Sequence, residues 1–486
     1  MLKCLLRLSI IWLFLGVTKP DSLLAQVTTS QDNSQSQLIC PAQLAPAIRE
    51  IVNRPQFQRS RWGIAIQTLD GKETLYALEA DKYFVPASNI KLLVSAAALS
   101  YLGAQYRIQT PVYAQGSTPN LTSLRIVGQG DPSLSSSQLQ DLAQQLQSQG
   151  IRRVEQLIVS DNHFREPAIN LTWQWEDIIF YYATAVNSLI LNENTVTLTL
   201  MPQQPGQAVK LSWDDAIAQR QWRVVNQGIT APAKNPYTIQ ITGFLAQPNL
   251  MIQGELATDA KPDSWRLAIP NPPSYFLESL RQILEIEGID VRRGIEQDFT
   301  SPEATETKIT TISSPPLAQL LQQANQRSNN IYAEALLYTL GSKFPDLTSA
   351  EAVKSILTDL GVDANSYFLA DGSGLSRQNL VSPNAITKTL QLMAQIPEAE
   401  VYRNSLSLAG VNGTLRRRFR NTAIEGKLWG KTGTLTGVTS LSGYLETNHY
   451  QPLVFSIMVN QSELAAKIQR QAIDEVVLLL SQLHHC

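Results

Sequence analysis

The chain has 486 residues, and its lysines and arginines (39) nearly balance its aspartates and glutamates (41), for a formal net charge of -2. This length exceeds one typical domain and predicts two to four. Hydrophobic residues make up 43% and charged residues 16%, a composition that excludes a mainly disordered chain. The near-neutral charge gives no support for nucleic-acid binding. No 20-residue apolar run follows the start of the chain, so we expect no internal membrane span.

Residues 1–25 are typical of a secretory signal. Lys3 and Arg7 precede the apolar stretch Leu8 to Val17, and the small residue Ala25 ends an acceptable cleavage site. An uncleaved anchor is the alternative, but the apolar stretch is short for a membrane span. We therefore expect an exported protein, periplasmic or otherwise extracytoplasmic. Peripheral contact with a membrane surface is left open.

Two cysteines, Cys40 and Cys486, remain once the signal and its Cys4 are removed. Two cysteines in an exported chain indicate a single disulfide, with two free thiols on terminal tails as the alternative. No histidine and cysteine cluster has metal-ligand spacing, so we expect no metal site.

The first elements surround a candidate nucleophile. A helix is predicted over residues 42–52, and two strands over residues 61–67 and 73–78 flank the turn at Asp70 and Gly71. Residues 84–99 follow, with Pro86 before an alanine- and leucine-rich stretch that predicts a buried helix.

Ser88 stands three residues before Lys91 at the start of that stretch. Residues i and i+3 share a helix face, so the hydroxyl and the amine can meet. A serine is a weak nucleophile until a base takes its proton, and lysine is such a base only when burial or a second cation lowers its pKa. A single S-x-x-K is common, and a helix start with an ordinary surface lysine is the alternative.

From about residue 110 to 305 the chain changes character. Short strands such as 123–127, 195–200 and 238–242 mix with helices over 137–149 and 274–288. The helix-rich character returns after Pro315 and Pro316.

Two further motifs lie in this last part. Ser328 and Asn330 precede the apolar helix predicted over residues 331–340. The run 431–434, Lys-Thr-Gly-Thr, has strand-like neighbours, and its Gly433 would let a substrate backbone lie close. Taken singly, the first motif is typical of a polar helix cap and the second of a strand-end turn.

Together the S-x-x-K, S-x-N and K-T-G motifs are the set shared by penicillin-binding proteins and class A β-lactamases. The chain resembles the D-alanyl-D-alanine carboxypeptidase/endopeptidase family, the class C low-molecular-mass penicillin-binding proteins of peptidase family S13. The stretches 371–377, 408–419 and 430–438 also carry this resemblance, which covers about residues 41–483. Asn329 stands where many relatives have aspartate, a position that does not carry the chemistry.

The resemblance implies an α/β (α+β) protein with the β-lactamase/DD-peptidase-like serine transpeptidase fold. An antiparallel sheet flanked by helices would carry two inserted mixed α/β domains, which the long interval between Ser88 and Ser328 can hold. The implied organisation is a signal (1–25), a flexible lead (26–40), a catalytic domain (41–109 and 306–486), an inserted domain II (110–165 and 265–305) and a nested domain III (166–264).

The resemblance also implies roles for single residues, and it implies no cofactor. Ser88 is the acylated nucleophile and Lys91 its base. Ser328 relays protons to the leaving group, Asn330 hydrogen-bonds Lys91 and substrate, and Lys431 keeps the local field positive. Thr432, Gly433 and Thr434 bind substrate, and the N–H groups of Ser88 and Thr434 form the oxyanion hole.

The implied activity is cleavage of the D-Ala-D-Ala end, or of a cross-link, in peptidoglycan stem peptides, with β-lactams acylating Ser88. A β-lactamase and a wall-binding protein with a dead site are the alternatives. Glu166 imitates a β-lactamase glutamate motif but precedes Ser328 instead of following it. The basic run 416–420 is either a solvated face or a contact to acidic cell-wall peptide. In this fold the terminal helices, residues 42–52 and 463–483 here, pack together, which would bring Cys40 and Cys486 within disulfide reach.

Overall fold

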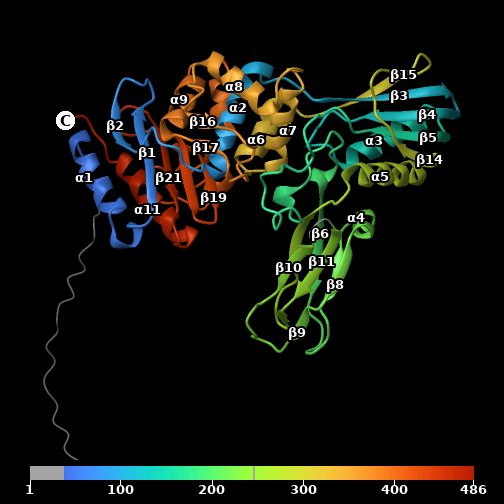
Figure 1. The fold of residues 1–486 in the computed structure, drawn as a ribbon, viewed down its shortest axis with the longest axis horizontal. Helices are drawn as coiled ribbons and strands as arrows, with labels where there is room; N and C mark the ends of the chain where they lie inside the picture. The colour runs from blue at the N-terminus through green and yellow to red at the C-terminus, as the bar shows by residue number, and fades with distance from the viewer. Residues whose placement is uncertain (1–37, 245–246) are drawn as a thin grey trace, which may run out of the picture. The chain divides into compact units, whose positions relative to one another are not determined.

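The computed structural model describes residues 38–244 and 247–486 (Figure 1). The predicted signal, its cleavage site and most of the flexible lead lie outside these residues. Within the described residues, no helix combines the length and the apolar composition needed to cross a membrane.

A six-stranded antiparallel sheet forms the part that carries the three motifs. Its order is β18-β19-β20-β21-β1-β2. The strands are β1 (Arg61–Thr68), β2 (Thr74–Leu78), β18 (Ser407–Leu408), β19 (Leu428–Leu435), β20 (Val438–Leu445) and β21 (Leu453–Asn460). β20 and β21 are buried along their whole length, because apolar residues on both faces pack into separate cores. Phe455 and Ile457 belong to one core, and Val454 and Met458 to the other.

The two terminal helices pack side by side on one face of this sheet (Figure 1). They are α1 (Pro41–Val52) and α11 (Ala466–Leu480). The structure joins Cys40 and Cys486, the pair predicted to form the disulfide, with their Cα atoms 5.8 Å apart. The bond closes a loop of almost the whole described chain.

The helices on the opposite face include the two that follow Ser88 and Ser328. The helices of this face are α2 (Lys91–Leu102), α6 (Leu317–Asn325), α7 (Asn330–Gly341), α8 (Ser349–Leu360), α9 (Pro383–Met393) and the short α10 (Ala399–Asn404). α2 is buried from Lys91 to Leu99 and α7 from Ile331 to Gly341, so both helices are enclosed on all sides. Their unbroken runs of alanine, leucine and other apolar residues follow from this position. A small pair, β16 (Tyr367–Phe368) and β17 (Leu380–Val381), lies nearby in sequence.

The long interval between the motifs builds further sheets. A five-stranded sheet has the order β14-β5-β4-β3-β15, with strands β3 (Gln109–Ser117), β4 (Asn120–Val127), β5 (Arg153–Ser160), β14 (Asp290–Glu296) and β15 (Thr307–Ser313). Its core includes residues of α3 (Ser136–Ser148) and α5 (Pro272–Ile286). The central sheet takes no strand from residues 110–305.

Smaller sheets occupy residues 195–268. They are formed by β6 (Thr195–Met201), β7 (Lys210–Trp213), β8 (Arg223–Asn226), β9 (Ile229–Ala231), β10 (Gln240–Phe244), β11 (Gln247–Gln253), β12 (Glu255–Ala257) and β13 (Asp263–Ala268), with α4 (Ala216–Gln221) between β7 and β8. The boundary predicted after residue 264 falls inside β13, whose pairing with β6 continues to Ala268. The domain boundaries otherwise stay a prediction.

Candidate active site

Ser88 lies on a 3₁₀ turn, η2 (Ala87–Ile90), and not within the α-helix that the sequence predicts; α2 begins only at Lys91. Side chains at i and i+3 of a 3₁₀ turn eclipse one another, which sets the amine directly beside the hydroxyl. The Lys91 Nζ donates to the Ser88 Oγ at 3.2 Å. Ala87 has a φ of 48°, a left-handed conformation that is strained for alanine and is typical of a functional turn.

Lys91 is fully buried, and its amine is fixed by two partners besides Ser88. Its Nζ donates to the Asn330 Oδ1 at 2.8 Å and to the backbone oxygen of Ser373. Burial lowers the pKa of Lys91 to about 8, although the acidic side chains of Asp371 and Glu334 act in the opposite direction. A base with a pKa near the working pH is the kind that transfers protons efficiently.

Ser328 and Lys431 form a second hydroxyl–amine pair in the same cleft. The Lys431 Nζ donates to the Ser328 Oγ and to the Thr432 backbone oxygen, both at 2.8 Å. Ser328 has a φ of 55° and directly precedes Asn329, the N-cap of α7. Burial, and then the Lys91 cation, lower the pKa of Lys431 well below its usual range. This works against a fixed positive charge on Lys431, because charging one of two neighbouring amines disfavours charging the other.

The strand β19 forms one wall of the cleft. Thr434 lines the cleft with Ser88, Ser328 and Asn330, and the space has a volume of about 410 Å³. A side chain at Gly433 would meet the Pro86 backbone oxygen, 2.7 Å from an added Cβ atom. Gly433 therefore lets the Ser88 turn pack against β19, which is a different reason from the substrate approach that the sequence suggested.

Two buried acidic residues that sequence reasoning missed hold the loop beside Lys91. Glu334 of α7 accepts hydrogen bonds from the backbone N–H groups of Gly372 and Ser373, at 3.0 and 2.8 Å. Asp371 accepts from the N–H groups of Gly374 and Ser376. These contacts aim the Ser373 oxygen at Lys91. The available signal was Glu334 itself, a single carboxyl inside an otherwise apolar helix.

Burial, with Asp371 second, raises the pKa of Glu334 to about 8. The raised pKa weakens the effect that Glu334 has on the pKa of Lys91 but does not remove it.

The segment between β5 and β6 contacts Asn330 and the loop that contains Asp371. The Trp173 Nε1 donates to the Asp371 Oδ2 at 2.9 Å, and the Asn170 Nδ2 donates to the Ala370 oxygen at 2.7 Å. The Asn330 Nδ2 donates to the Tyr182 oxygen at 2.6 Å. These contacts span more than 100 positions of the chain, and no local pattern announces them.

Glu166, the residue that imitates a β-lactamase motif, is used elsewhere. It accepts a hydrogen bond from the backbone N–H of Ser349 at 3.0 Å, at the start of α8. Acidic groups stabilise helix N-termini in this way. Glu166 does not line the cleft that holds Ser88.

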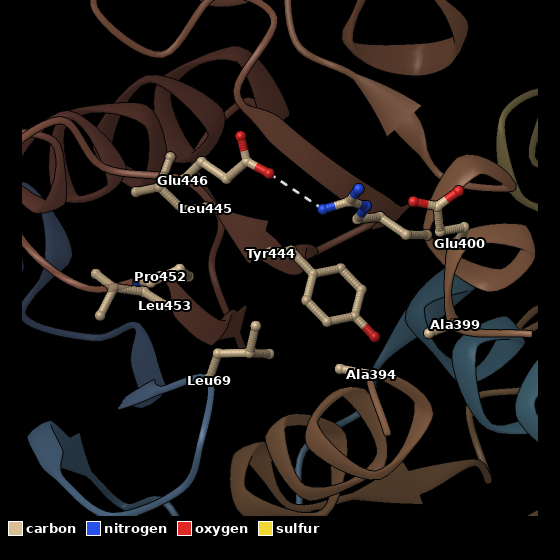
Figure 2. Close-up of a pocket in the computed structure, with 10 residues that line it drawn as sticks. Leu69, Ala394, Ala399, Glu400, Tyr444, Leu445, Glu446, Pro452 and Leu453 are labelled. Carbon is tan, nitrogen blue, oxygen red and sulfur yellow. Dashed lines mark hydrogen bonds and ion pairs between the residues drawn. The ribbon is translucent and has the colours of Figure 1, made fainter. Parts of the chain in front are cut away.

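A second cavity, of about 220 Å³, lies away from the motifs (Figure 2). Its walls are mostly apolar, and Arg403 at the wall pairs with Glu446 at 3.1 Å. Tyr444 and Leu445 of β20 line it. Lys431 of β19 lies opposite Ser442, which precedes these two residues in β20. None of the predicted site residues lines this cavity.

Within the described residues, the potential metal-ligand atoms of Cys40, His484 and Cys486 lie within 4.8 Å of one another. The two sulfurs are joined to each other, so this cluster cannot act as a thiolate site.

The profile of the D-Ala-D-Ala carboxypeptidase 3 (S13) family matches residues 44–482. The chain belongs to this family. It is 29% identical to a D-alanyl-D-alanine carboxypeptidase of Actinomadura sp. over 465 residues, which is 91% of this chain and 85% of the relative. As an S13 peptidase, it is a hydrolase of the D-Ala-D-Ala carboxypeptidase type.

The fold is that of a solved penicillin-binding protein. The crystal structure of penicillin binding protein 4 from Haemophilus influenzae superposes with a TM-score of 0.79 at 24% identity, covering 89% of this chain and 98% of the other. A complex of that protein with a novel β-lactam gives a TM-score of 0.74 at 23% identity over the same shares. The predicted DD-peptidase-like fold class is confirmed.

Proposed function

We propose that this chain cleaves the D-Ala-D-Ala bond of peptidoglycan stem peptides through an acyl-enzyme on Ser88. The observation that carries the proposal is the contact between the Lys91 amine and the Ser88 hydroxyl, 3.2 Å apart, at an amine whose pKa is lowered to about 8. Membership of the S13 family supports the choice of substrate.

Each residue then has one step in the reaction. Neutral Lys91 takes the Ser88 proton while the Oγ attacks the carbonyl carbon of the penultimate D-alanine. The N–H groups of Ser88 and Thr434 stabilise the oxyanion. The proton then passes from Lys91 through Ser328, which Lys431 holds, to the leaving nitrogen as the C–N bond breaks, and Lys91 is neutral again. Water then hydrolyses the ester, which frees Ser88 and the shortened peptide.

The same arrangement accounts for binding of the negatively charged end of the substrate. A substrate carboxylate beside Lys431 and Thr432 would raise the pKa of Lys431 again, because an opposite charge favours the ammonium form. The positive field expected at Lys431 is therefore proposed for the substrate complex.

The proposal includes export and covalent inhibition by β-lactams. The signal-like residues 1–25 and the Cys40–Cys486 bond both favour an oxidising compartment outside the cytoplasm. A β-lactam carries a strained amide in place of the D-Ala-D-Ala bond and would acylate Ser88 in the same way.

Labelling with a fluorescent penicillin tests the proposal. We expect one adduct, mapped by tandem mass spectrometry to the peptide that contains Ser88, and no adduct in Ser88→Ala. Ser100→Ala, at the exposed end of α2, is the matched control and should label like the wild type. Labelling of Ser88→Ala at another serine would refute the assignment, and rapid release of the adduct would favour a β-lactamase.

A further inference from the structure

We propose that a basic groove beside the cleft binds the acidic leaving peptide when the substrate is a cross-link between two stem peptides. The basic groove is defined by Arg327, Arg416 and Arg417, together with Thr414. This inference rests on the proposed function and adds the class of leaving group that the site accepts.

The basic groove adjoins the catalytic cleft. Arg327 lines both spaces, and it directly precedes Ser328. The groove has a volume of about 660 Å³. That is within the range of spaces that take ligands much larger than a single amino acid.

The position of the basic groove relative to the scissile bond follows from β19. Thr434 supplies an oxyanion N–H, so the carbonyl carbon lies near Thr434, and the Ser328–Lys431 pair faces the leaving nitrogen. Thr432 comes next in that direction, and its Oγ1 donates to the Thr414 Oγ1 at 2.8 Å. The groove therefore begins where the departing part of the substrate must lie.

Hydrogen bonds connect the wall of the basic groove to the segment that precedes Ser328. The Thr414 N–H donates to the Gln326 backbone oxygen at 3.1 Å, two residues before Ser328. The Ser407 Oγ also contacts the Gln326 oxygen, at 3.3 Å, and the Thr414 Oγ1, at 3.1 Å. A ligand held by this wall is thus held in register with Ser328.

The charge of the basic groove is uncompensated. Its lining, drawn from the described residues, contains three arginines and no acidic side chain. All three arginines are exposed, and none of them takes part in an ion pair formed within residues 38–244 and 247–486. Guanidinium groups bind carboxylates through paired hydrogen bonds, so an anionic ligand suits this wall.

The rest of the basic run shows the contrast. Arg418, in the same run, pairs with Asp474 of α11 and is mostly buried, so it serves packing. The Arg420 Nε donates to the Arg416 backbone oxygen at 2.8 Å, which supports the turn that presents Arg416. The run is thus divided between structure and an open cationic surface.

Two substrates differ in what would enter the basic groove. An uncross-linked pentapeptide releases one D-alanine with a single carboxylate. A cross-linked dimer releases a whole stem peptide, which carries further carboxylates. The groove is large enough and positive enough to favour the second, so its arginines should raise activity on cross-links over activity on free termini.

The test compares purified uncross-linked pentapeptide muropeptide with cross-linked dimer muropeptide. In Arg416→Gln/Arg417→Gln, we expect the ratio of kcat/KM for dimer to kcat/KM for pentapeptide to fall about tenfold. Arg293→Gln, an exposed arginine on β14, should leave the ratio unchanged. Arg416→Lys/Arg417→Lys should recover part of the ratio, because it keeps the charge.

Salt provides a readout that needs no variant. Raising the ionic strength should lower the wild-type kcat/KM on the dimer more than on the pentapeptide. An unchanged ratio in the double variant, with both substrates still cleaved and penicillin labelling intact, would overturn the inference. If the double variant does not label, the single variants Arg416→Gln and Arg417→Gln decide by the same ratio. Wild-type protein that cleaves neither substrate and takes no penicillin would instead refute the proposed function.

Discussion

Lys91 is the residue whose protonation state decides whether the proposed acylation of Ser88 can proceed. It is buried, and its amine has three oxygen neighbours, on Ser88, Asn330 and Ser373. Burial removes water that would stabilise the ammonium form, which lowers the pKa of this lysine. The opposing effect of Asp371 and Glu334 keeps that pKa from falling further. The amine is therefore poised near the pH at which it must accept a proton.

The lowered pKa of Lys91 predicts that the rate of acylation rises with pH. Below a pH of about 8 Lys91 holds its proton and cannot take the one from Ser88, so the second-order rate constant for penicillin acylation should rise with pH through that value. Lys91→Arg stays protonated and should lose about 10²- to 10⁴-fold at every pH. Stopped-flow measurement between about pH 5.5 and 9.5 checks both. A flat wild-type profile would show that another group is the base.

At the scale of elements, the sheet is closed off by two helices from opposite ends of the chain. α1 and α11 share one core with β1, β20 and β21, and the Cys40–Cys486 bond lies at their ends. Backbone bonds continue the contact, since the Ile39 N–H donates to the Gln482 oxygen at 2.9 Å. The disulfide thus fixes elements that already pack together.

Removing that bond should loosen the terminal helices without touching the cleft. We expect Cys40→Ser to lower the free energy of unfolding by about 2–4 kcal/mol. Urea denaturation followed by circular dichroism measures the change, and Ser481→Ala, a substitution at the end of α11, serves as the control. The penicillin acylation rate should stay within about twofold of wild type. Two alkylatable thiols in unreduced wild-type protein from the native compartment would contradict the bond.

At the scale of the whole described chain, the smaller sheets form a unit that can be removed at one point. Thr195 and Ala268 pair at the ends of β6 and β13. The Ile269 N–H also donates to the Asn194 oxygen at 2.9 Å. The chain therefore leaves and returns at neighbouring positions. The segment that touches the cleft, with Trp173 and Tyr182, lies before this point.

We expect replacement of residues 195–268 by a short glycine linker to retain penicillin labelling of Ser88, with some loss of stability because part of a shared core is exposed. The family organisation predicts that a deletion of residues 110–305 leaves a core that still holds the three motifs. The contacts of the structure change this expectation to a loss of labelling, because the deletion also removes Trp173, the partner of Asp371, and Tyr182, the partner of Asn330. Labelling and thermal unfolding of both variants check this. A folded 195–268 deletion that takes no penicillin would show that the smaller sheets build the site.

The sequence alone determined what depends on neighbours in the chain. The spacing of Ser88 and Lys91, the strand context of Lys431 and the helix of residues 42–52, one residue shorter than α1, all follow from local periodicity and turn chemistry. The family resemblance supplied the order of the motifs and the fold. Local sequence patterns do not predict the 3₁₀ turn that contains Ser88, because its conformation depends on packing against Gly374 and Gly433.

Only the tertiary structure decided which distant groups meet. Glu334 and Asp371 lie 37 positions apart, yet both hold the Ser373 loop against Lys91. The sequence does not decide whether the basic run 416–420 is a solvated face or a contact to acidic cell-wall peptide. In the structure the arginines of this run have different surroundings. Arg418 pairs with Asp474, whereas Arg416 and Arg417 line a groove with Arg327 beside the cleft. Such partnerships depend on packing between remote segments, and local sequence carries no record of which segments will be neighbours.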